Sequence, residues 1–133
     1  MSRWSAAGDD RGSGPVDFVL VGALLTTLTL AVLQLGFAVY VRNVVHDAAV
    51  EGAHYAALAD TTLDDGAERT RASIVRAVGD GFAGDIAVSQ SDRLGYPTAV
   101  VTVRTTLPVI GLLGIPYGLE VDAHAPMESL GEE

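Results

Sequence analysis

The hydrophobic pattern sets the first third of the chain apart from the rest. From Phe18 to Val41 there are 24 residues without a charge. As an α-helix this run would be about 36 Å long, which exceeds the ~30 Å hydrocarbon core of a bilayer. Its threonines can return their hydroxyls to the backbone, and Gln34 can hydrogen-bond to a neighbouring helix. The pattern therefore predicts a transmembrane helix over residues 16–41.

Two other interpretations explain this run less well. A cleaved secretory signal has an apolar region of about 7–15 residues that ends at small residues, whereas this run is longer and continues into Arg42, Asn43 and Val44. A buried helix of a soluble protein is also disfavoured, because the segment is apolar all round. Arginine placement predicts the orientation: Arg3 and Arg11 precede the run and Arg42 follows it, which favours a cytoplasmic N-terminus.

An amphipathic pattern continues beyond the apolar run. Apolar or small residues recur every three or four positions, so the helix is expected to extend out of the membrane and end near Asp60–Asp65. The stripe consists of Val41, Val44, Val45, Ala48, Ala49, Gly52, Ala56 and Ala59. Within it Ala48, Gly52 and Ala56 are small residues spaced by four, which would let a neighbouring backbone pack closely. Ordinary alanine-rich helix propensity explains the same spacing equally well.

A second, shorter helix is predicted over Ala67–Val78. Asp64 or Asp65 would cap its start, and Gly79 and Gly81 would end it. The apolar period then changes to two, which predicts three strands with one buried face. The inward positions are Ile86, Val88, Ala99, Val101, Val103, Leu119, Val121, Ala123 and Ala125. The expected fold class is α+β: a long N-terminal helix, transmembrane and then amphipathic, a second short helix, and a small three-stranded antiparallel sheet covered by the first helix.

Two segments connect the predicted strands. Residues 94–97 (Leu-Gly-Tyr-Pro) supply a turn between the first two. Leu107–Pro116 is apolar but too short to span a bilayer, and its two prolines and two glycines predict that it lacks regular structure. This segment is either a loop that covers the core or an exposed contact surface.

Composition narrows the classes of function. The chain has 133 residues, a formal net charge of −9, no lysine and no cysteine. Residues 42–133 hold 6 arginines against 14 acidic residues. An acidic chain without a basic cluster is a poor candidate for binding nucleic acid. Without cysteine there is no disulfide framework, no thiolate nucleophile and no cysteine-ligated zinc.

No motif in the sequence points to catalysis or to a cofactor. Residues 79–84 match G-x-G-x-x-G, but they end a predicted helix and precede a strand, which is the reverse of a phosphate-binding loop. His46, His54 and His124 lack the spacing of metal ligands and are expected in solvent. Asp64-Asp65-Gly66 lacks the remaining ligands of a calcium loop. We therefore expect no enzyme, no metal and no cofactor.

The residues that stand out lie just before the apolar run. They are Arg11-Gly12-Ser13-Gly14-Pro15-Val16-Asp17-Phe18. A polar leader with arginine ends in glycine, and a single carboxylate precedes the long apolar helix. By itself this carboxylate is explained by helix structure, because Pro15 suits a first turn and a negative charge there complements the helix dipole.

The combination resembles the processing site of class III signal peptides, as found in type IV pilins and pseudopilins. More closely, it resembles the TadE-like family of minor pseudopilins. Members begin with R-G-S-x-x-V-E-F, followed by an apolar helix, a y-x-R-N stretch and an A-x-E-G-A-R-Y-A-A block. Here these elements are residues 11–18, Tyr40-Val41-Arg42-Asn43, and residues 48–57 with the sequence AAVEGAHYAA. The resemblance covers residues 11–60.

The resemblance implies a maturation step and an assembly mechanism. A prepilin-type peptidase would cut after Gly12, leaving Ser13 as the new N-terminus and Asp17 as the fifth mature residue. In the family that position is usually Glu, and it is thought to pair with the N-terminal amine of a neighbouring subunit. An ammonium and a carboxylate in an apolar bundle each need such a partner. Asp17 is one methylene shorter than Glu, and Gly14-Pro15 replaces the usual small residues.

The expected domains and partners follow from the resemblance. Residues 1–15 would be a cytoplasmic leader, 16–41 a single span of the bacterial cell membrane, and 42–133 a pilin-like domain outside it or in a pilus. The implied partners are the major pilin, other minor pilins, the prepilin peptidase and the inner-membrane assembly platform of a tight-adherence-type pilus or a related secretion system. The competing hypothesis is a single-pass, membrane-anchored extracytoplasmic binding or accessory module with no filament role.

Overall fold

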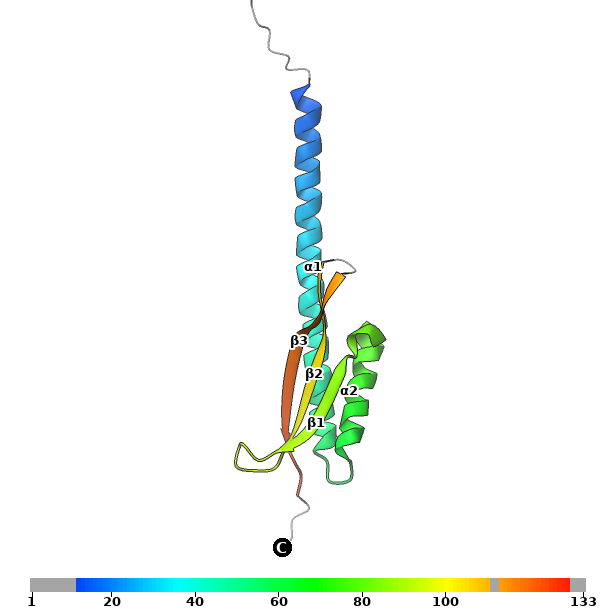
Figure 1. The fold of residues 1–133 in the computed structure, drawn as a ribbon, viewed down its shortest axis with the longest axis vertical. Coiled ribbons are helices and arrows are strands. Elements are labelled where there is room, and N and C mark those ends of the chain that lie inside the picture. Colours follow the sequence, from blue (N-terminus) through cyan, green and yellow to red (C-terminus); the bar gives the residue numbers. More distant parts are fainter. Residues whose placement is uncertain (1–11, 111–112, 130–133) are drawn as a thin grey trace, which may run out of the picture. The chain divides into compact units, whose positions relative to one another are not determined.

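A long N-terminal helix, a second short helix and a three-stranded antiparallel sheet confirm the predicted α+β class (Figure 1). The computed structural model describes residues 12–110 and 113–129. Its elements are α1 (Ser13–Ala56), α2 (Leu63–Val78), the 3₁₀ helix η1 (Asp80–Phe82), β1 (Asp85–Ser91), β2 (Thr98–Ile110) and β3 (Leu113–Pro126). The chain divides into two compact units between Leu33 and Gln34, and α1 contributes to both.

The part of α1 in the first unit buries none of its side chains over residues 13–33. Its threonine hydroxyls are satisfied within the helix: Thr27 Oγ1 donates to the Ala23 carbonyl and Thr29 Oγ1 to the Leu25 carbonyl, both at 2.8 Å. α1 is the described helix that is long and apolar enough to cross a membrane, and its most apolar stretch is unburied. An apolar surface with internally satisfied hydroxyls fits a membrane anchor.

The second unit is built on the antiparallel sheet, in the order β1-β2-β3. One face of the sheet is apolar, and every inward position predicted from the two-residue period lies in the core or packs against it. The opposite face is polar. There Arg104 of β2 lies directly across from Glu120 of β3, and its Nε donates to Glu120 Oε2 at 2.6 Å.

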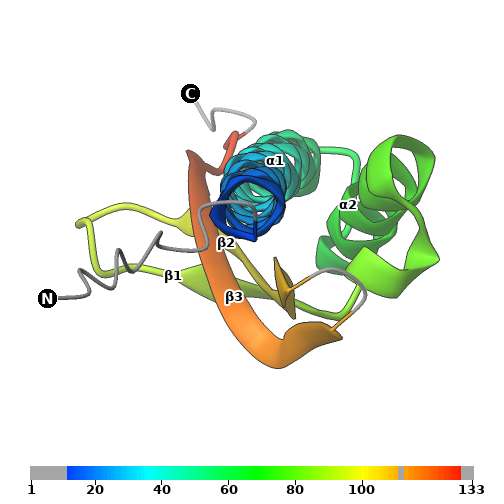
Figure 2. The same cartoon turned by 90° about the horizontal axis from the view of Figure 1, so that it is seen from above.

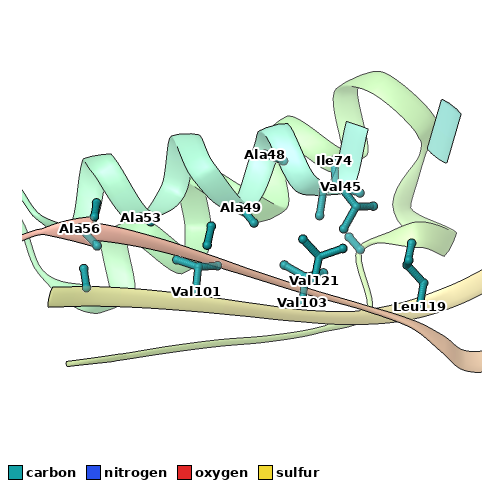
Figure 3. Close-up of a cluster of buried hydrophobic side chains, with 14 of the residues drawn as sticks. Val45, Ala48, Ala49, Ala53, Ala56, Ile74, Val101, Val103, Leu119 and Val121 are labelled. Carbon is teal, nitrogen blue, oxygen red and sulfur yellow. The ribbon is translucent and has the colours of Figure 1, made fainter. Parts of the chain in front are cut away.

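The C-terminal half of α1 and the whole of α2 lie side by side over the apolar face (Figures 1 and 2). Figure 3 shows Val45 and Ala49 of α1 turned toward Val101 and Val121 of the sheet. α2 contributes Ile74, which is fully buried. Each buried valine or isoleucine stabilises such a core by roughly 1.5–3 kcal/mol. Because α1 contributes residues to this core, the predicted cover of the sheet by the first helix is present.

The first helix ends earlier than predicted. It stops at Ala56, not near Asp60–Asp65. The inward stripe is also slightly different, because Ala53 and Ala57 are buried whereas Ala59 is exposed. A helical period that is extrapolated past the true end assigns the wrong face to residues in the following turn.

The second helix starts earlier than predicted, at Leu63 rather than Ala67. Its cap is Thr62, not Asp64 or Asp65. Thr62 Oγ1 accepts the Asp65 N–H at 3.2 Å, and Asp65 Oδ2 accepts the Thr62 N–H at 2.8 Å. This capping box satisfies two backbone donors reciprocally, and the hydrogen bonds from Thr62 hold the pKa of the Asp65 carboxyl below its ordinary value.

The sequence predicted that Leu107–Pro116 would lack regular structure, but the segment belongs to the β2–β3 hairpin. Residues 111–112 of this segment lie outside the described residues. The prediction was wrong because proline is tolerated at an open edge and at a bulge. β1 pairs with β2 only as far as Asp85 opposite Arg104, so β2 has an open edge beyond that point. The same stretch of the β2–β3 ladder contains two register shifts.

Candidate functional site

The predicted processing site lies at the start of α1. Gly12 directly precedes the helix and Ser13 is its first residue, and both are exposed. A Cβ added to Gly12 would meet no described atom within 4 Å, so packing does not explain why glycine stands there. The preceding leader, with Arg3 and Arg11, lies outside the described residues.

Asp17 follows one helical turn after Ser13 and is exposed among apolar neighbours such as Phe18. It is the only acidic residue of α1 before Asp47. Within the described residues, Asp17 forms no ion pair. An unpaired carboxylate on an apolar membrane helix is costly, and such residues usually find a cationic partner. The structure therefore shows Asp17 as an exposed carboxylate on an otherwise apolar part of α1.

A polar cluster ties α1 to α2 farther along. Glu51 Oε1 accepts a hydrogen bond from Arg69 Nε at 2.7 Å and forms an ion pair with Arg69 Nη2 at 2.7 Å. Glu51 Oε2 accepts a hydrogen bond from Ser73 Oγ at 2.7 Å. The Arg69 guanidinium also lies 5.7 Å from the centre of the Tyr55 ring. The hydrogen bond from Ser73, followed by that from Arg69, holds the pKa of the Glu51 carboxyl below its ordinary value.

The sequence did not single out Glu51 for any role. The available signal was its place beside Gly52 in the A-x-E-G-A block of residues 48–57. The structure shows that these two neighbours face the same element, because Glu51 binds α2 through side-chain atoms and Gly52 receives the α2 backbone.

The small residues Ala48, Gly52 and Ala56 are all buried. The ideal Cβ position at Gly52 lies 2.8 Å from the Gly66 carbonyl oxygen, and that at Gly66 lies 2.5 Å from Ala56 Cβ. Thr70 completes the contact, donating its Oγ1 to the Gly66 carbonyl at 2.9 Å. Within this chain, the backbone that approaches the small stripe is therefore that of α2.

A second contact joins α1 to the far end of the β2–β3 hairpin. Gln34 Nε2 donates to the carbonyl of Pro108 in β2 at 3.1 Å. One turn along, the Phe37 and Phe82 rings meet edge to face, with centroids 6.1 Å apart and an interplanar angle of 77°. The sequence predicted that Gln34 would bond to a neighbouring helix, whereas this described bond reaches a strand. The local pattern carried no information about Pro108.

The histidines lie at the surface, and the glycine motif lies at the end of α2 and before β1. His46, His54 and His124 are exposed, as predicted, and the described residues contain no group of three or more side chains that could hold a metal. In the G-x-G-x-x-G stretch, Gly79 caps the end of α2 with a φ of 98°. Gly84 lies against the β2 backbone, because a Cβ there would meet the Arg104 carbonyl. These glycines serve a helix end and a close backbone approach.

An apolar N-terminal helix that continues into a small α+β domain fits the class of membrane-anchored proteins. Residues 12–54 match the family model described as TadE-like protein, which confirms the resemblance to the TadE-like family. No curated protein and no solved structure matches the chain. The match shows that this segment is similar to the TadE-like family.

The matched segment nearly coincides with α1, since the match covers residues 12–54 and the helix covers Ser13–Ala56. It contains Gly12, Asp17 and Glu51. The family resemblance is therefore carried by α1, while α2 and the sheet lie outside the match.

Proposed function

We propose that this protein is a minor pilin or pseudopilin, a structural or assembly component of a tight-adherence-type pilus or a related secretion system. One observation carries the proposal: within the TadE-like segment a lone carboxylate, Asp17, stands exposed on an otherwise apolar helix, one turn after the Gly12–Ser13 bond. The role is structural rather than catalytic.

Cleavage after Gly12 would create an ammonium group on Ser13. Ser13 and Asp17 are four residues apart, which is about 6 Å along a helix axis. A second copy displaced along the axis by about one helical turn would bring its N-terminal amine level with Asp17. Each charge then has a partner in a medium where an isolated charge is strongly unfavourable. The pairing would set the offset between adjacent helices.

The proposed topology follows from the same arrangement. The leader faces the cytoplasm, where the prepilin peptidase and the inner-membrane assembly platform act on this class of protein. The domain after the span lies outside, where the major pilin and other minor pilins are available. The net negative charge of residues 42–133 is compatible with this side, because positive residues are enriched in cytoplasmic loops.

The first test is proteolytic maturation. Co-expression of the full chain with its prepilin peptidase should remove 12 residues, as measured by intact mass and N-terminal sequencing. Gly12→Leu should block cleavage, because it changes the residue before the cut. Gly22→Leu is the control and should not block it. The two changes are matched, because an added Cβ meets no described atom within 4 Å at either glycine. Retention of Met1 in cells with active peptidase would contradict the proposal and favour the membrane-anchored accessory module.

The second test addresses Asp17 directly. In the host strain, Asp17→Asn should abolish recovery of the protein with sheared pili, or with the assembled secretion complex, because it removes the charge. Asp17→Glu keeps the charge and should retain recovery. Equal recovery of wild type and Asp17→Asn would remove the pairing mechanism while leaving the membrane anchor intact.

A further inference from the structure

The end of the β2–β3 hairpin is apolar and uncharged. We define the hairpin end as Leu107 and Pro108 of β2 and Ile115–Tyr117 of β3. Residues 107–117 hold no charge in the sequence. Ile115 is 52% exposed and Tyr117 64% exposed, so the hairpin end presents apolar side chains that this domain does not cover. The outer face of the sheet beyond it is polar, with the Arg104–Glu120 pair.

The hairpin end lies level with the charge-free part of α1, because Gln34 of α1 donates a hydrogen bond to the Pro108 carbonyl of β2. The first charged residue of α1 after Gln34 is Arg42, eight residues and about 12 Å farther along the axis. A bilayer crossed by α1 would therefore reach the hairpin end before it ended at Arg42.

Aromatic residues mark the same level. Phe37 contacts Phe82, whose carbonyl accepts the Thr105 hydroxyl at 2.6 Å, which places this part of β2 opposite Phe37. Tyr40 of α1 is 51% exposed and Tyr117 of β3 lies near the register shift after Thr105. Tyrosines are enriched where a membrane protein meets the boundary between lipid and water.

The backbone directs Tyr117 away from the core. Its φ is 55°, which is unusual for a bulky residue. Gly118 follows, where an added Cβ would come within 3.1 Å of both Ile115 and Leu107. The kink falls where the β2–β3 ladder shifts register, and such irregularities commonly redirect a side chain.

We propose that the hairpin end is a lipid contact, in which Ile115 and Tyr117 enter the boundary between headgroups and acyl chains of the outer leaflet. The domain is then held on the bilayer at two points, α1 and the hairpin end. Lipid is the occupant because the surface is continuous with the membrane helix through Gln34 and carries no charge. The inference rests on the membrane anchorage of α1 but not on a pilus role.

Fluorescence quenching by brominated lipid tests this contact. The chain has one tryptophan, Trp4, so Trp4→Phe gives a silent background in the full chain. Tryptophan is then placed at Tyr117, at Leu28 in the apolar helix, or at Tyr96. Tyr96 is the matched control, because it is also an exposed tyrosine, 48% exposed, but it precedes the opposite end of β2. Each variant is reconstituted in phosphatidylcholine vesicles with and without brominated acyl chains.

We expect bromine to quench Tyr117→Trp and Leu28→Trp and to leave Tyr96→Trp bright, with a blue-shifted emission for the first two. Quenched Leu28→Trp with unquenched Tyr117→Trp would overturn the lipid contact while leaving the anchor in place. The emission of Tyr117→Trp could instead be blue-shifted but not quenched, and the blue shift could be lost when more lipid dilutes the protein in the membrane. That result would overturn the lipid contact and show that a second copy covers the hairpin end. Unquenched Leu28→Trp would overturn the anchor and the contact together, whereas the cleavage test of Gly12 is independent of all these outcomes.

Discussion

A single methyl group at Gly52 tests the packing of α1 against α2. The change is Gly52→Ala. Its Cβ would lie 2.8 Å from the Gly66 carbonyl oxygen and closer still to Thr70 Oγ1. Both obstacles are fixed, since the carbonyl belongs to a helix backbone and Thr70 is fully buried. The methyl group can therefore be accommodated only if the two helices move apart.

Two opposing effects determine how much Gly52→Ala changes the stability of the domain. Alanine in place of glycine inside a helix favours folding by up to about 1 kcal/mol. Overpacking a well-packed contact disfavours folding by about 1–3 kcal/mol. Because the obstacles at Gly52 cannot rotate away, the overpacking cost should fall at the upper end of its range. We expect a net loss of about 2 kcal/mol in the stability of the domain.

Hydrogen exchange measures this loss in the full chain in detergent micelles, read on peptides from α2 and the sheet. A loss of about 2 kcal/mol corresponds to about 30-fold faster exchange where opening is global. Gly36→Ala is the control in the same helix, because an added Cβ there meets nothing within 4 Å. It should leave exchange unchanged or slow it. Combining Gly52→Ala with Thr70→Ala should recover part of the loss, since residues in contact are coupled.

The reasoning fails if Gly52→Ala exchanges like the wild type and like Gly36→Ala. That result would mean that α2 does not press on the stripe at Gly52. A loss that Thr70→Ala does not relieve at all would show that the Gly66 backbone, not the threonine hydroxyl, is the sole obstacle.

Two further substitutions probe polar contacts of the domain. Hydrogen bonds from Ser73 and Arg69 lower the pKa of Glu51 below its ordinary 4.5, so its contribution to stability is complete above that pH and is lost as pH falls through the lowered pKa. Glu51→Gln should therefore lower the stability by less than about 1 kcal/mol at neutral pH, because the Glu51–Arg69 pair is half exposed. It should also flatten the acid side of the profile of melting temperature against pH, followed by near-UV circular dichroism. An unchanged acid slope would contradict the prediction. Thr105→Val removes the hydroxyl that donates to the Phe82 carbonyl of η1 at 2.6 Å, and it should lower the stability by about 1–3 kcal/mol. The control Thr102→Val, on the outer face of the sheet, should not lower the melting temperature. Equal effects of the two substitutions would refute the prediction.

Much of the fold was predictable because its signals are local. The two-residue period placed Val101 and Val121 inward, and the structure buries both. The boundaries were less accurate because they depend on one competing residue. Thr62 and Asp65 have the spacing of a capping box, but a prediction that rests on the acidic residues alone starts the helix four positions late.

The polar contacts between elements were not predictable, because no local pattern encodes them. Arg69 and Ser73 reach Glu51 across 18 and 22 positions of sequence, and Pro108 meets Gln34 across 74. A period identifies which face of an element is buried but not which polar residue on another element it meets. For the same reason the prediction of irregular structure for Leu107–Pro116 was wrong, since the open edge of β2 can be identified only once the length of β1 is known.

These long-range contacts constrain how copies of the chain can associate. The spacing of Ala48, Gly52 and Ala56 predicts that a neighbouring backbone can pack closely, and α2 of the same chain occupies the Gly52 position, where Glu51 holds it. A second helix could use that surface only after α2 had separated from it, which requires breaking the Glu51 hydrogen bonds and exposing Ile74. Association through α1 is therefore expected along its unburied residues 13–33, which is also the part of the helix that carries Asp17. The Asp17→Asn and Gly52→Ala variants should accordingly separate two effects: the first impairs association without loosening the domain, and the second loosens the domain without removing the charge.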